Sequence, residues 1–111
     1  MSDFTYIYDI GTYHGRTYYL GVRATPNLDV VRSFAVVLFY EKSNGESVEV
    51  AKIDDSEHES GSVHFDRYYR SAGANQKDFD VDVSSVFEAE ERLAENWRRY
   101  ARLHEENHGA E

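Results

Sequence analysis

The sequence contains no cysteine and a single proline, Pro26. Without cysteine, the chain can form no disulfide framework, no zinc–thiolate site and no thiol nucleophile. Long apolar runs are also missing, since the longest, residues 34–40, is far shorter than the roughly 20 residues that span a bilayer. Residues 1–4 have neither the basic start nor the apolar run of a signal peptide. These absences predict a soluble, cytoplasmic protein with no membrane partner.

Lysine is scarce as well: Lys42, Lys52 and Lys77 are the three lysines among 12 basic residues, against 21 acidic ones. The formal net charge is −9. An acidic surface with few lysines is typical of a salt-adapted, halophilic protein, because dissolved ions screen its self-repulsion. The alternative is an ordinary acidic protein. The shortage of cations excludes a general nucleic-acid coat but leaves room for a local basic patch.

The 111 residues suit one domain that buries a core without disulfides. Alternating apolar and polar residues, bounded by turn residues, predict β-strands. The predicted strands are residues 4–10, 16–23, 30–41, 46–53, 63–70 and 79–83. Between the third and fourth of these, Asn44-Gly45 predicts a hairpin with a type I′ turn. Gly21 interrupts the second strand, where a bulge or close packing is expected.

The last element is predicted to be a helix over about residues 85–105, with a frayed tail at 106–111. Ser85 and Glu88 have the spacing of a capping box, in which each side chain bonds a free backbone N–H of the other. One stripe at three- and four-residue steps comprises Val86, Ala89, Leu93, Trp97, Tyr100 and His104. The whole chain, residues 1–111, is therefore predicted to be one α+β domain: an antiparallel β-sheet of five to six strands packed against one C-terminal α-helix.

Residues 63–70 gather a histidine, a carboxylate, two guanidinium groups and two phenols in one predicted strand. Successive side chains of a strand point to opposite faces. One face carries His64, Asp66, Tyr68 and Arg70, and the other carries Val63, Phe65, Arg67 and Tyr69. The first face has no apolar residue that would require burial. This strand is the best candidate for a site in the sequence.

Cleavage of RNA without a metal needs a base for the 2′-hydroxyl, an acid for the leaving oxygen and a cation for the phosphate. The predicted strand and the acidic loop before it contain all three kinds of group. The candidates are His58, His64 and Asp66 as catalytic groups, and Arg67, Tyr68 and Arg70 as substrate-binding groups. The alternative is that these are solvated side chains on the open face of a sheet.

The acidic loop at residues 54–59, together with His64 and Asp66, also suits a divalent metal by residue type. Its spacing matches neither the Asp-x-Asp-x-Asp-Gly calcium loop nor the His-Glu-x-x-His zinc motif. An acidic loop in an acidic protein is usually solvated. We therefore predict no metal ligand and no cofactor.

Nine tyrosines suggest a different class of function. The first two predicted strands carry Tyr6, Tyr8, Tyr13, Tyr18 and Tyr19, more than a small core needs. Tyrosine binds partners well because its large rigid ring loses little entropy on ordering. The second hypothesis is thus a non-enzymatic protein-interaction module, including a homodimer, that uses its tyrosine-rich N-terminal strands.

The order of the elements, together with the segment VHFDRYY at residues 63–69, resembles the small TumE-type toxins of toxin–antitoxin systems and related uncharacterised families. The resemblance covers roughly residues 34–100. His64 matches the first histidine of the family's His-x-His cluster and Asp66 stands at the second, while Arg67 and Tyr68 match its basic and aromatic positions. The resemblance implies a growth-inhibiting toxin with a ribonuclease-like activity on RNA or a related phosphate-bearing target. It also implies an antitoxin partner.

Overall fold

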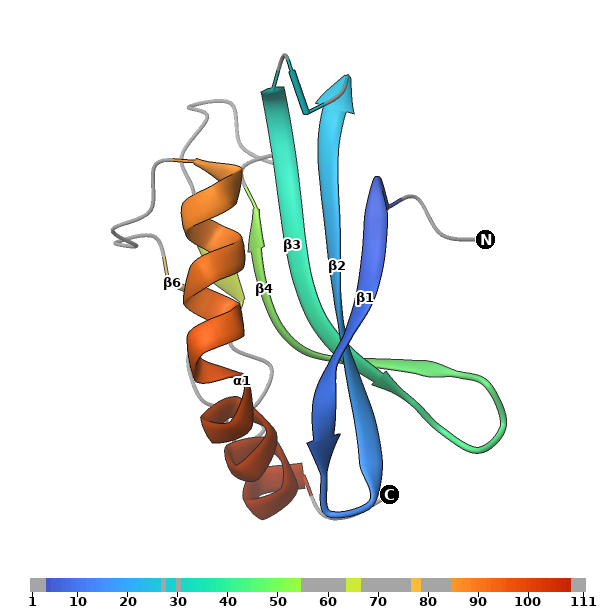
Figure 1. Cartoon of the computed structure of the whole chain (residues 1–111). Coiled ribbons are helices and arrows are strands. Elements are labelled where there is room, and N and C mark those ends of the chain that lie inside the picture. Colours follow the sequence, from blue (N-terminus) through green and yellow to red (C-terminus); the bar gives the residue numbers. More distant parts are fainter. Residues whose placement is uncertain are drawn as a thin grey trace.

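The computed structural model has two layers, an antiparallel sheet and one helix that lies along one of its faces (Figure 1). It describes residues 4–26, 28–29, 31–54, 64–66, 77–78 and 85–108. The four long strands are β1 (Tyr6–Tyr13), β2 (Arg16–Pro26), β3 (Val31–Glu41) and β4 (Ser47–Asp54), and each pairs with the next. Two short strands, β5 (His64–Asp66) and β6 (Lys77–Asp78), continue the sheet beyond β4. The helix is α1 (Val86–His108). The α+β class, the antiparallel sheet and the C-terminal helix agree with the prediction.

The core lies between the helix and the face of the sheet that it covers. Side chains at alternate positions of β2 and β3 enter it, as the period of a strand requires. From the sheet these are Tyr18, Leu20, Val22, Phe34, Val36, Leu38, Tyr40, Val50, Ala51, Ile53 and Phe65. The predicted helical stripe meets them: Val86, Ala89, Leu93, Trp97, Tyr100 and His104 are all buried. Fully burying one aliphatic side chain such as Leu93 contributes roughly 1.5–3 kcal/mol, so the packing of α1 on the sheet contributes substantially to the stability of the fold.

The helix begins where the capping signal predicted and ends later than predicted. The Ser85 hydroxyl accepts a hydrogen bond from the Glu88 backbone N–H at 3.2 Å. Helix α1 continues to His108, beyond the predicted end at about residue 105. Two contacts explain the extra turn: Arg102 pairs with Glu106 at 3.9 Å, and Glu105 bonds His14 of the β1–β2 turn at 2.9 Å.

Both hairpin turns form where turn residues predicted them. His14 and Gly15 link β1 to β2 with φ angles of 53° and 78°. In the β3–β4 turn, Gly45 has a φ of 90°, but Asn44 has no positive φ. The type I′ geometry expected there is therefore wrong, because it needs positive φ at both central residues. The Asn44 side chain instead accepts a hydrogen bond from the Glu46 backbone N–H at 2.9 Å.

The two hairpins diverge at their turn ends. The β1–β2 hairpin follows the C-terminal end of α1, whereas the β3–β4 hairpin curves away from it (Figure 1). A register shift between Asp9 and Gly11 in β1, and another at Val50 of β4, opposite Leu38 and Phe39, accompany this bending. Of the strand predicted at residues 63–70, the structure describes His64–Asp66, which form β5. The rest of that segment and the strand predicted at 79–83 lie outside the described residues.

Candidate functional site

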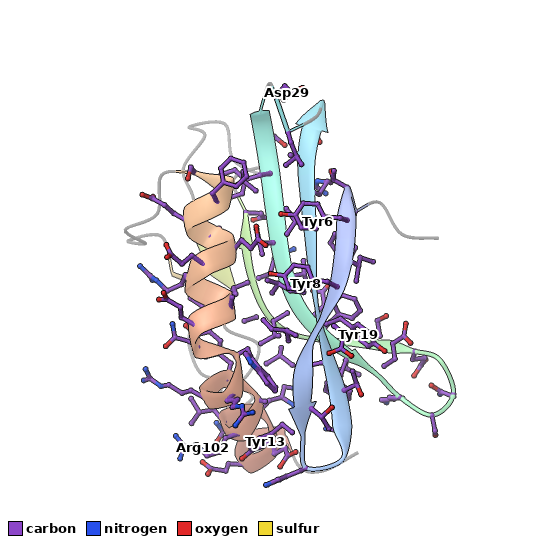
Figure 2. All side chains as sticks on the ribbon, viewed as in Figure 1. Tyr6, Tyr8, Tyr13, Tyr19, Asp29 and Arg102 are labelled. Carbon is purple, nitrogen blue, oxygen red and sulfur yellow. The ribbon has the colours of Figure 1, made fainter. Side chains whose placement is uncertain are left out.

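The sheet face that α1 leaves uncovered is the candidate site and is called the open face here. Leu20 and Leu38 face the helix, so their neighbours Tyr19 and Phe39, which pair across β2 and β3, belong to the open face. Figure 2 shows Tyr19 on the side of the sheet away from α1. Lys52 of β4 pairs with Val37 and belongs to the same face.

Three aromatic rings form a row on the open face. The Phe4 ring stacks on Phe39 with centroids 5.9 Å apart, and Tyr19 stacks on the same ring at 5.6 Å. Gly21 makes the row possible, since a Cβ at that position would lie 2.8 Å from the Phe4 ring. The close packing expected at Gly21 is confirmed. Because the rings of Phe4 and Tyr19 cover it, Phe39 is only 7% exposed on a face that α1 does not cover.

An ion pair lies at the β4–β5 end of the open face. Lys52 Nζ is 3.7 Å from Asp54 Oδ2, and Asp54 is buried. In the antiparallel register Asp54 pairs with His64, and Lys52 pairs with Asp66. Phe65 is fully buried and packs edge-on against Tyr100 of α1 at 5.8 Å. By alternation, backbone positions 64 and 66 therefore belong to the open face, beside the ion pair.

The structure thus places the backbone of two of the six predicted site residues, those of His64 and Asp66, next to each other on one face. The other four lie outside the described residues: His58, Arg67, Tyr68 and Arg70. Sequence reasoning missed Lys52 as a neighbour of the site, and it grouped Asp54 with His64 and Asp66 only as candidate metal ligands. The i, i+2 spacing of Lys52 and Asp54 at the end of the fourth predicted strand was the available signal.

Most of the tyrosines on the first two strands have partners inside the molecule. The Tyr6 and Tyr8 hydroxyls donate to the two carboxylate oxygens of Glu90, at 2.7 and 2.8 Å, and both side chains point from β1 toward α1 (Figure 2). Burial and then the bond to Glu90 raise the pKa of Tyr6 to about 12, and the same causes raise the pKa of Tyr8. Tyr18 is fully buried in the core.

Strand β1 forms an edge of the sheet. It pairs with β2 on one side, and no strand among the described residues pairs with its other side. Natural edge strands are usually protected by lysine, proline, several charges or a β-bulge, and the register shift between Asp9 and Gly11 gives β1 only the last of these. The eight residues of β1 contain one charged residue, Asp9, and neither lysine nor proline. Ile7 and Tyr8 are 42% and 36% exposed.

The described part of the chain contains no group of three or more histidine, aspartate or glutamate side chains placed to hold a metal ion. Within those same residues, no helix is long and apolar enough to cross a membrane.

An antiparallel sheet with α1 on one face, and no helix among the described residues on the other, defines a small α+β domain. The chain belongs to the family described as Domain of unknown function (DUF7718), whose model matches residues 1–110. No curated protein and no solved structure matches the chain. The open face and the β1 edge both lie within the matched residues, so both are parts of the family's domain.

Proposed function

We propose that this protein is a non-enzymatic protein-interaction module that forms a homodimer through the edge of β1. The observation that supports the proposal is the edge itself, an eight-residue strand with one charge and with Ile7 and Tyr8 exposed. Unpaired backbone donors and acceptors along an edge are a template for a further strand. A second β1 in antiparallel orientation would satisfy the edges of both copies.

A second copy of this chain suits the edge because a twofold axis gives a closed interface in which both copies use the same surface. Asp9 limits where the axis can lie, since two carboxylates directly opposite each other destabilise a strand pair. An axis at Tyr8 avoids this clash and places Ile7 opposite Asp9. Each copy carries a formal charge of −9, so dissolved salt should favour the dimer by screening their repulsion.

Light scattering over a series of salt concentrations tests the homodimer. Wild-type protein should be dimeric at high salt, and Ile7→Lys should be monomeric because a charged edge resists strand pairing. Phe87→Lys is the matched control, since Phe87 is 56% exposed but lies on α1. It should remain dimeric. A wild-type monomer at every salt concentration, or equal dimerisation of Ile7→Lys, would contradict the proposal.

The β4–β5 register supports a second candidate, a toxin-like protein acting on RNA or a related phosphate-bearing target. Positions 64 and 66 lie beside the Lys52–Asp54 ion pair. A histidine next to an ammonium and carboxylates could transfer protons while the cation binds phosphate. In this candidate His58 and Asp66 assist His64, and an antitoxin covers the site. The resemblance to TumE-type toxins points in the same direction.

Induced expression in a host of matching salinity tests the second candidate. Wild-type protein should arrest growth with loss of RNA, and His64→Ala should not. His14→Ala is the matched control, because His14 lies in the β1–β2 turn. It should arrest growth like wild type. Equal growth with all three proteins would rule out the activity.

A further inference from the structure

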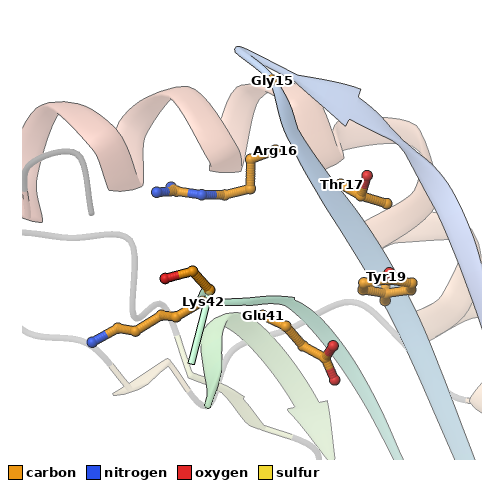
Figure 3. Close-up of a pocket in the computed structure, with 7 residues that line it drawn as sticks. Gly15, Arg16, Thr17, Tyr19, Glu41 and Lys42 are labelled. Atoms are coloured by element: carbon orange, nitrogen blue, oxygen red, sulfur yellow. The ribbon is translucent and has the colours of Figure 1, made fainter. Parts of the chain in front are cut away.

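A polar notch separates the two hairpins where they diverge. It is a cleft of about 430 Å³, a size within the usual range for small-molecule sites. Its lining comes from the β1–β2 turn, the start of β2 and the end of β3: Gly15, Arg16, Thr17, Tyr19, Glu41, Lys42 and Ser43. Figure 3 shows the Arg16 and Lys42 side chains on opposite sides of the gap, with the Glu41 carboxylate pointing away from both.

Arg16 is held in place without a carboxylate partner. Its guanidinium lies 4.0 Å from the centre of the Tyr40 ring, a cation–π contact that fixes the plane of the group. Among the described residues no carboxylate lies within ion-pair distance of Arg16. Burial raises the pKa of the Tyr18 hydroxyl and the neighbouring Arg16 guanidinium opposes that rise, so the buried Nη1 belongs to the Tyr18 side of the group. An anion in the cleft would accept from the remaining guanidinium N–H groups in a charge-assisted hydrogen bond.

Lys42 supplies the second positive charge. Its ammonium lies 3.7 Å from Glu46, with 30% and 68% of the two side chains exposed. An ion pair this exposed contributes little stability, so an incoming anion can compete with Glu46 for the Lys42 ammonium. The Thr17 and Ser43 hydroxyls line the same cleft and are further donors.

We infer that the notch between the β1–β2 and β3–β4 hairpins binds a phosphate group, with Arg16 as its fixed contact and Lys42 as its second cation. A planar guanidinium offers parallel N–H donors that match two phosphate oxygens. Glu41 also lines the cleft and Glu46 pairs with Lys42, so direct contacts from the two cations, and not a local excess of positive charge, would hold the anion. The site is independent of both proposed functions.

The cleft is larger than one phosphate ion. It therefore has room for the organic part of a phosphate monoester. Inorganic phosphate and adenosine monophosphate share the same phosphate chemistry. Comparing them shows whether the organic part contributes.

Titration of ¹⁵N-labelled full-length protein, at an ionic strength held constant with sodium chloride, tests the site. Inorganic phosphate should shift the amide signals of Gly15, Thr17 and Ser43 and saturate at a Kd on the order of 1–10 mM. Tighter binding of adenosine monophosphate would identify a phosphate monoester as the ligand. Equal binding would identify the free ion. Absence of saturable shifts with both compounds would overturn the site.

Variants assign the binding to the two cations. Arg16→Gln should weaken phosphate binding roughly tenfold or more, since a charge-assisted pair of hydrogen bonds is lost. Lys42→Gln, at a partly exposed position, should weaken phosphate binding by a smaller factor. This variant still tests the site if Arg16→Gln does not fold. Arg102→Gln is the matched control, because this arginine also pairs with a glutamate four residues away but lies on α1. Binding that is unchanged in Lys42→Gln and in folded Arg16→Gln, or equally weakened in Arg102→Gln, would overturn the assignment.

Discussion

The backbone of Gly11 packs directly against the indole ring of Trp97. A Cβ at position 11 would lie 2.5 Å from Cζ2 of Trp97, and Gly11 has a φ of +151°. The register shift of β1 falls at this glycine. The bent edge strand therefore packs closely against the helix, because Gly11 has no side chain and the indole ring of Trp97 fills the space.

Gly11→Ala should lower the free energy of unfolding by about 2–4 kcal/mol, because the new methyl group meets the ring and the backbone angle is strained. Urea denaturation measures the loss. Gly15→Ala is the matched control: Gly15 has a φ of +78°, but its Cβ would have nothing within 4 Å. It should cost about 1–2 kcal/mol. Equal losses in the two variants would show that the contact with Trp97 is unimportant.

Glu90 holds β1 to α1 by accepting hydrogen bonds from Tyr6 and Tyr8. Glu90→Gln should reduce the free energy of unfolding by about 1–2 kcal/mol, since both bonds lose their charged acceptor. Glu91→Gln, at an exposed neighbouring position, should leave it within about 0.5 kcal/mol of wild type. A double-mutant cycle with Tyr6→Phe measures the coupling. If the losses of stability in Glu90→Gln and Tyr6→Phe simply add in the double mutant, a direct bond between the two side chains is contradicted.

Alkaline pH should destabilise the protein through the same contact. The pKa of Tyr6 is raised from 10.0 to about 12, so the folded state keeps its proton where the unfolded state loses it. This contribution to stability is fully present below pH 10.0 and is lost as the pH rises toward about 12. Thermal unfolding at a series of pH values measures the loss, and tyrosinate absorbance reports the titration. Tyr6→Phe should show a shallower loss, and an identical slope would contradict the assignment to Tyr6.

The Ser85 cap should contribute about 1 kcal/mol to stability. Ser85→Ala removes the acceptor of the Glu88 N–H, so urea denaturation should begin at a lower concentration. Ser85→Asp is the control, since its carboxylate can accept the same bond and suits the positive end of the helix dipole. It should match or exceed wild-type stability. A loss as large in Ser85→Asp as in Ser85→Ala would point to a role other than capping.

The local patterns predicted the elements of the fold but not their long-range contacts. The apolar stripe through Trp97 was enough to place the buried face of α1, because helical periodicity is local. The end of the helix was not predictable in the same way. It is stabilised by a bond between Glu105 and His14, which are 91 residues apart.

In the candidate sites, too, the local features were predictable from the sequence and the long-range contacts were not. Alternation placed positions 64 and 66 on one face, but the neighbourhood of Lys52 and Asp54 depends on which strand pairs with β4. Tyr6 was predicted to face a partner, and its hydroxyl bonds Glu90, 84 residues away. The notch depends likewise on the bending of two hairpins. Strand order and bending are tertiary properties, which a single sequence does not display.

The helix follows all the strands in the chain, and this order has a kinetic consequence. The contacts that join β1 and the β1–β2 turn to α1 span 82 to 91 residues, so they form only after most of the chain is available. The pairs β1–β2, β2–β3 and β3–β4 join neighbours in the chain and can form earlier, whereas contacts that close such long loops form late. During synthesis the apolar face of the sheet would stay uncovered until α1 arrives. The acidic character of the chain would then protect it by keeping nascent copies apart.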